Sequence, residues 1–247
     1  MAEMSPYDTN LLALARANPE TIAEVVNAFR AIDDLLPAND GLKWFNWLYL
    51  QVTEAVQSRI AAGGFADPAW LERLDVEFAL IYLKALESSL EPWLESQPVP
   101  GCWRILFERR GDVMLARIQF ALAGANAHIN HDLPLAIVKA CELSGLGPAP
   151  GSAQYNDFAA VNSTLETLFE SAKETLHVRL PGGALPEFSH LEDTIAAWNV
   201  TAAREAAWVN AEALWTIRDA SFLGGRYVEM LDGITAVIGK SLLTVAH

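Results

Sequence analysis

The sequence predicts an all-α protein, and two observations carry this prediction. Apolar residues recur at the three- and four-residue spacing of one helix face along almost the whole chain. Alternating β-branched segments bounded by hairpin turns do not occur in the 247 residues. With 52% hydrophobic and 19% charged residues, the chain can build a sizeable core. We expect a single domain over residues 1–247, a bundle of roughly eight or nine helices around an apolar core or cavity.

Capping residues followed by proline mark the starts of two helices in the first half of the chain. Asn18-Pro19 begins a helix that we expect to run to Pro37, and Asp67-Pro68 begins one that ends before Pro98. Between them lies a long helix closed by Gly63-Gly64. Its core stripe consists of Phe45, Leu48, Val52, Val56 and Ile60.

Glycine- and proline-rich loops divide the second half into further helices. Loops at 145–151 and 181–186 separate them, and Ser189 and Glu192 have the spacing of a capping box at a helix start. The helices that we expect cover 103–130 with an interruption near Gly111, 133–143, 156–176, 189–222 and 227–244.

Charge and cysteine content exclude several classes of function. The net charge of −14 repels nucleic-acid backbones and anionic membrane surfaces, so we expect neither as a partner. Cys102 and Cys141 are too few for a disulfide framework or a cysteine zinc cage. The N-terminus lacks the pattern of a secretory signal, and no apolar run of about 18 residues occurs. We expect a soluble cytoplasmic protein, with a homo-oligomer left open.

The segment 127–134 is the strongest candidate site, because it gathers two of the five histidines and a carboxylate among apolar residues. His128 and Asp132 are four residues apart and share one helix face. Helical projection places them on an apolar stripe, with Asn126 and Asn130 well off it. Because a buried carboxylate needs a partner, we expect His128 and Asp132 to be in contact, directly or through a metal, in the interior. A structural alternative makes Asp132 the N-cap of the helix 133–143.

Small residues precede this pair on the same face. Ala121, Gly124 and Ala125 lie one or two turns before it. They leave room either for a ligand or for close packing of helices.

The chain resembles an actinobacterial family of helical proteins of unassigned function along most of its length. The resemblance is carried by a central Asn-Ala-His-Ile-Asn-x-Asp-Leu-Pro motif at 126–134 and by two flanking elements. The flanking residues are Asp75, Phe78, Ala79 and Tyr82 upstream, and Arg204, Ala207 and Trp208 downstream. This resemblance implies a helical fold and no particular reaction.

The same segment is similar to motifs of metal-dependent all-α hydrolases. His128-x-x-x-Asp132 resembles the ligand pair of zinc-dependent phospholipase C and related nucleases, and His131-Asp132 resembles the dyad of the His-Asp phosphohydrolases. Those families need further ligands that are mostly histidine. Because only His177, His190 and His247 remain elsewhere, a metal here would rely on carboxylates.

Ionisable groups on apolar helix faces extend the candidate site. Asp75 and Arg204 are predicted to converge with His128 on one cavity, although they could instead pair with each other to join two helices. Glu205 and Glu212 each precede a tryptophan by three residues, which is typical of half-exposed helix flanks.

We therefore expect an enzyme that acts on a small, largely apolar molecule in a cavity between helices. In one form, a divalent metal such as zinc, iron or manganese activates water for hydrolysis. In a metal-free lyase or cyclase, Asp132 orients His128 as an acid–base group and Arg204 stabilises negative charge. The alternative is a non-catalytic protein that binds a small ligand. The predicted residues are His128, Asp132 and Arg204 for catalysis, Asn126, Asn130, Tyr82 and Trp208 for substrate binding, and His128, Asp132 and Asp75 for a metal.

Overall fold

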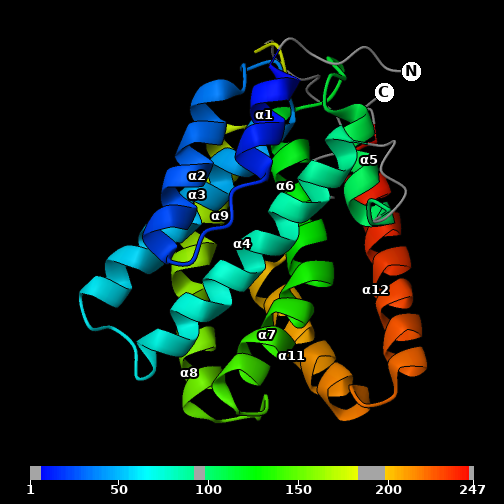
Figure 1. Ribbon diagram of the computed structural model, residues 1–247. Coiled ribbons are helices and arrows are strands. Elements are labelled where there is room, and N and C mark those ends of the chain that lie inside the picture. Colours follow the sequence, from blue (N-terminus) through cyan, green and yellow to red (C-terminus); the bar gives the residue numbers. More distant parts are fainter. Residues whose placement is uncertain (1–6, 92–97, 183–197, 245–247) are drawn as a thin grey trace.

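The computed structural model describes residues 7–91, 98–182 and 198–244, and these ranges fold into helices (Figure 1). The only β feature of the described residues is an isolated antiparallel bridge between Ala116 and Arg179, which confirms the all-α prediction. The elements are α1 (Asp8–Ala15), α2 (Ile22–Leu35), α3 (Leu42–Ala61), α4 (Pro68–Leu90), α5 (Gly101–Arg109), α6 (Arg117–Ala127), the π-helical turn η1 (His128–Asp132), α7 (Leu133–Ser144), α8 (Ala153–Ala160), α9 (Asn162–Thr175), α11 (Val200–Ile217) and α12 (Ser221–Leu242).

The helix start predicted at Asn18-Pro19 is wrong. Helix α2 begins at Ile22, because the Thr21 side chain accepts a hydrogen bond from the backbone N–H of Glu24. The Glu24 carboxylate in turn accepts the backbone N–H of Glu20. These two local bonds place the start of α2 after Thr21 and not at Pro19.

The start predicted at Asp67-Pro68 is confirmed. The Asp67 carboxylate accepts the backbone N–H of Trp70 at 3.1 Å, and Pro68 occupies the first helical position of α4. The preceding helix α3 also ends as expected, with Gly63 in the left-handed region at a φ of 71°. Both boundaries are determined by a capping residue, a proline or a glycine at the helix end, so the sequence predicts them.

Several longer helices are divided more finely than the sequence predicts. The interruption near Gly111 is confirmed and separates α5 from α6. The helix expected over 156–176 is two helices, α8 and α9, which meet at Val161. Helix α12 begins at Ser221, not at 227. The start predicted at Ser189 and Glu192 lies outside the described residues.

The α6–η1–α7 segment occupies the middle of the bundle, with α4 crossing in front of it in the view of Figure 1 and α12 to its right. Helix α6 packs against α3 and α12, and α7 packs against α4 and α11. The π-helical turn itself contacts α4, α11 and α12. Nearly the whole of α6 is therefore buried. None of the described helices is both long and apolar enough to cross a membrane.

Gly124 lets α6 approach α3 closely. A Cβ atom added at Gly124 would lie 2.3 Å from the Phe45 ring, so the small-residue face serves close helix packing at this point. We expect Gly124→Ala to destabilise the protein by roughly 1–3 kcal/mol, the usual range for overpacking of a core. Urea denaturation checks this value. Gly233→Ala in α12, where an added Cβ atom would meet nothing within 4 Å, is the matched control and should not destabilise the protein. An unchanged stability of Gly124→Ala would contradict the packing.

Candidate functional site

The candidate site is built on the π-helical turn η1 between α6 and α7. In such a turn the backbone hydrogen bonds span five residues instead of four, so one extra residue is inserted into the helix. Asp132 has helical dihedral angles and its side chain accepts no capping bond, so the predicted N-cap role of Asp132 is wrong. The carboxylate is directed to side-chain partners instead.

Asp132 is completely buried and accepts three hydrogen bonds from side chains. His128 Nδ1 lies 2.9 Å from Oδ2, and His131 Nδ1 lies 2.7 Å from Oδ1. Trp103 Nε1 donates to Oδ2 at 3.0 Å. The predicted contact of His128 and Asp132 in the interior is confirmed.

The three ionisable groups of this cluster have different protonation preferences. Burial alone would raise the pKa of Asp132, but the hydrogen bonds from the two histidines lower it below its usual value, so the carboxylate is ionised. Burial lowers the pKa of His128 and outweighs its bond to Asp132. For His131 burial acts in the same direction, but the hydrogen bond to Asp132 raises its pKa overall. Neutral His128 with its proton on Nδ1 therefore presents a lone pair on Nε2.

The Nε2 atom of His128 is buried and has no hydrogen-bond partner among the described residues. The imidazole stacks on Phe78 with ring centroids 3.3 Å apart, and Tyr49 lies edge-on at 4.5 Å. His128 lines a cavity of about 40 Å³ whose walls are otherwise mostly apolar. Tyr49, Val52, Phe78 and Arg204 are among the other residues that line it.

A second cavity of about 50 Å³ adjoins the first, since Tyr49, Val52, Phe78 and Arg204 line both. Asp75 lines the second cavity and His128 the first. Arg204 thus lines both cavities, whereas Asp75 and His128 line different ones, so the three residues do not share one cavity as predicted.

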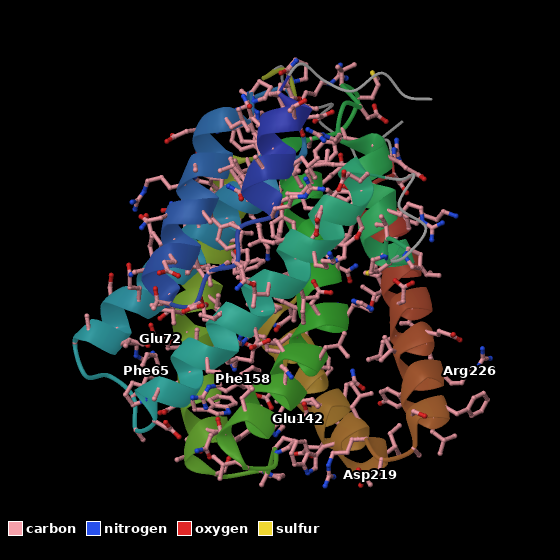
Figure 2. All side chains as sticks on the ribbon, in the orientation of Figure 1. Phe65, Glu72, Glu142, Phe158, Asp219 and Arg226 are labelled. Carbon is pink, nitrogen blue, oxygen red and sulfur yellow. The ribbon has the colours of Figure 1, made fainter. Side chains whose placement is uncertain are left out.

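Arg204 does not pair with Asp75, so the structural alternative for these two residues is wrong. Arg204 Nε donates to Asn162 Oδ1 at 2.7 Å, and Nη2 donates to the carbonyl oxygen of Phe158 at 2.8 Å. The guanidinium also lies over the ring of Phe158, which Figure 2 labels on the lower part of the bundle. These partners are neutral, and burial lowers the pKa of Arg204 to about 9.

Asp75 is a buried carboxyl group, and one of its oxygens, Oδ2, makes no hydrogen bond to the described residues. Burial, with a smaller contribution from the charge of Glu72, raises the pKa of Asp75 to about 7. Asp75 is therefore largely protonated in mildly acidic solution.

The four predicted substrate-binding residues lie outside the two cavities. Asn126 Nδ2 donates to the carbonyl oxygen of Thr235, and Asn130 Nδ2 donates to Asn126 Oδ1, both at 2.9 Å. Helical projection fails for Asn126, which is fully buried, because α12 covers that side of α6. Tyr82 is buried among aromatic rings, and Trp208 donates to Glu212 within α11.

The predicted metal ligands are not gathered into a chelating set. Among the described residues, one group of three potential metal ligands has all its ligand atoms within 4.8 Å of one another, namely Cys102, His131 and Asp232. This set excludes His128, Asp132 and Asp75.

Sequence reasoning missed five residues of this region, namely Tyr49, Phe78, Trp103, Cys102 and Asp232 as site residues. Phe78 was expected on the core face of its helix and in a family motif, and Trp103 was left open between helix packing and the lining of an apolar pocket. One signal was available, because Phe45 and Tyr49 are four residues apart on the face of α3 that packs on α6.

Comparison with known proteins identifies the family. The model of a family described as "Family of unknown function (DUF5995)" matches residues 22–245, so the chain belongs to this family. No curated protein and no solved structure matches the chain. The membership in an all-helical family of unassigned function that the sequence motifs predict is confirmed.

Proposed function

We propose from the geometry that the protein, whose family has no assigned reaction, is a cytoplasmic enzyme. It would remove a proton from the carbon next to the carbonyl group of a small, largely apolar compound. His128 acts as the general base. The observation that carries the proposal is its buried Nε2 atom, which has no partner and belongs to a side chain that lines an apolar cavity.

Asp132 prepares His128 for this role. By accepting the proton on Nδ1, the carboxylate selects the tautomer with a free lone pair on Nε2 and stabilises the imidazolium that forms when Nε2 takes a proton. Trp103 and His131 hold the carboxylate from other directions, so it cannot rotate away. A base held in this way loses little entropy as the reaction begins.

Tyr49 and Arg204 are suited to stabilise the oxygen of the substrate. When the base removes a proton from the carbon next to a carbonyl group, negative charge develops on the carbonyl oxygen. The Tyr49 hydroxyl is buried without a partner, and burial raises its pKa, so it remains a donor. Arg204 adds a positive charge whose hydrogen-bond partners are neutral. Such donors lower the barrier most where water is excluded.

The size of the cavities limits the substrate. At about 40 and 50 Å³, each holds only a few water-sized groups, far less than the several hundred Å³ of a typical ligand site. Phe78 lines both cavities and covers His128. We expect the Phe78 side chain to turn aside when substrate enters, which joins the two cavities.

A metal-dependent hydrolase with its metal at His128 is less well supported than the metal-free enzyme. Both oxygens of Asp132 already accept hydrogen bonds from side chains, and Asp75 does not join His128 and Asp132 in a set of ligands. A metal at His128 would have to displace those donors. The metal-free acid–base enzyme uses the bonds as they stand.

Hydrogen–deuterium exchange tests the proposal without knowledge of the final product. The protein is incubated in deuterated water with a panel of short-chain and cyclic ketones, and mass spectrometry follows deuterium at the carbon next to the carbonyl group. We expect the wild-type protein to catalyse exchange on some members. His128→Gln should slow it by about 10²–10⁴-fold, the usual contribution of a general base.

His177→Gln is the matched control, because His177 lies outside both cavities. It should exchange at the wild-type rate. Full activity of His128→Gln would overturn the catalytic role of His128. Absence of exchange, together with a small molecule retained in native mass spectrometry and lost in His128→Gln, would show a non-catalytic binding protein instead.

A further inference from the structure

A second cluster adjoins Asp132 through His131, whose Nδ1 lies 2.7 Å from Asp132 Oδ1. Cys102 comes from the start of α5, His131 from η1 and Asp232 from α12, and their ligand atoms lie within 4.8 Å of one another. We propose that Cys102, His131 and Asp232 bind a zinc ion, at a site distinct from the His128 cavity.

The donor set matches the preferences of zinc. Thiolate, imidazole and carboxylate are its usual protein ligands, with bonds of about 2.0–2.3 Å. In a tetrahedral site these bonds separate the ligand atoms by roughly 3.3–3.8 Å. The present separations, all within 4.8 Å, therefore need side-chain shifts of about 1 Å to close around the ion.

His131 already has the carboxylate partner that is typical of a metal-binding histidine. Its Nδ1 is bonded to Asp132 Oδ1 at 2.7 Å, which leaves Nε2 as the nitrogen for a cation. A carboxylate that holds the other ring nitrogen is the common outer partner of zinc-binding histidines, because it sets the tautomer and raises the basicity of the ligand.

Asp232 is held in place by the backbone of α5. Its two carboxylate oxygens accept the N–H groups of Gly101 and Cys102, each at 2.8 Å. A Cβ atom at Gly101 would lie 3.1 Å from Asp232 Oδ2, so glycine permits this close approach. Each carboxylate oxygen retains a lone pair for a metal.

The environment of Cys102 favours a cation over a free nucleophilic thiolate. The carboxylates of Asp132 and Asp232 place negative charge near the Cys102 thiol, and a cation bound there would offset that charge. Zinc binding replaces the thiol proton, which leaves to solvent, with a Zn–S bond. Cys102 and His131 are buried, whereas Asp232 is partly exposed and offers the ion a route of entry.

Cobalt(II) titration of untagged, reduced protein tests the site. Cobalt takes the place of zinc and reports a bond to sulfur through a near-ultraviolet charge-transfer band. We expect one equivalent of cobalt to produce this band and tetrahedral visible bands, and zinc to abolish them by displacement. Failure of the wild-type protein to bind either metal would overturn the proposal.

Variants locate the ligands. Cys102→Ser should lose the charge-transfer band, whereas Cys141→Ser, which changes the other buried cysteine, should keep it. Asp232→Asn should weaken cobalt binding at least tenfold, and Asp132→Asn should weaken it by about 10–100-fold, as loss of an outer partner does. Circular dichroism verifies that each variant is folded.

The same titration separates this site from the proposed enzyme. His128→Gln should retain the cobalt spectrum, because His128 is not a ligand. Cobalt binding that survives Cys102→Ser but disappears in His128→Gln would place the metal at the other histidine and overturn the assignment. Deuterium exchange of ketones by the wild-type protein is measured separately, and its result tests the proposed enzyme independently of the zinc site.

Discussion

Replacing Asp132 with alanine is expected to lower the free energy of unfolding by about 3–5 kcal/mol, the cost of removing one partner from a buried charged network. The side chain is 0% exposed and accepts bonds from His128, His131 and Trp103. Its removal leaves three buried donors without an acceptor, at roughly 1–3 kcal/mol for each that finds no water. Urea denaturation at neutral pH measures the effect.

Two further variants make this result specific to the hydrogen bonds of Asp132. Asp132→Asn keeps one acceptor oxygen and should lose less stability than Asp132→Ala. Asp219→Ala removes an exposed carboxylate at the turn before α12 (Figure 2) and should change stability by no more than about 0.5 kcal/mol. A loss below about 1 kcal/mol for Asp132→Ala would show that water or rearrangement satisfies the three donors.

Asp75→Asn is expected to stabilise the protein in alkaline solution and to have little effect in acid. The pKa of Asp75 is about 7 in the folded protein against 3.8 for the unperturbed group. Between these values the folded state binds more protons than the unfolded state, so the stability of the wild-type protein falls as the pH rises. Above the folded pKa the whole penalty is present, about 4 kcal/mol from the size of the shift. Asparagine carries no charge at any pH, so the Asp75→Asn protein does not pay this penalty.

Denaturation of wild-type and Asp75→Asn protein at pH values from 4 to 8 checks this prediction. The difference in unfolding free energy should be small at the acid end and should widen steadily toward pH 8. Asp219→Asn, at an exposed position, should show no such widening. A difference between wild-type and Asp75→Asn that stays constant with pH would contradict a buried, protonated Asp75.

Helix boundaries were predictable where the backbone is capped by neighbouring residues. Asp67 before Pro68 and the glycine turn at Gly63 determine their helix ends through bonds or dihedral angles within a few residues. The start at Thr21 was missed although its capping bond from Glu24 is equally local, because Asn18-Pro19 offered a competing start nearby. The division between α8 and α9 has no comparable signal in glycine or proline.

The arrangement around Asp132 was only half predictable. The i, i+4 spacing of His128 and Asp132 indicates their contact on any regular helix. His131 is next to Asp132 in the chain, and adjacent residues on a regular α-helix point in different directions. The extra residue of the π-helical turn changes this geometry, and both imidazoles reach the same carboxylate. Nothing in the local pattern of apolar residues predicts that turn.

The sequence by itself determined the all-α class, several helix ends and a buried pair of His128 and Asp132, because these features depend on residues within one or two helical turns. Only the tertiary structure decided which side chains surround that pair. Trp103 meets Asp132 across 29 positions, and Asp232 meets Gly101 across 131. Such contacts depend on how helices rotate and cross as they bury their apolar faces, and the periodicity of a single helix carries no information about its neighbours.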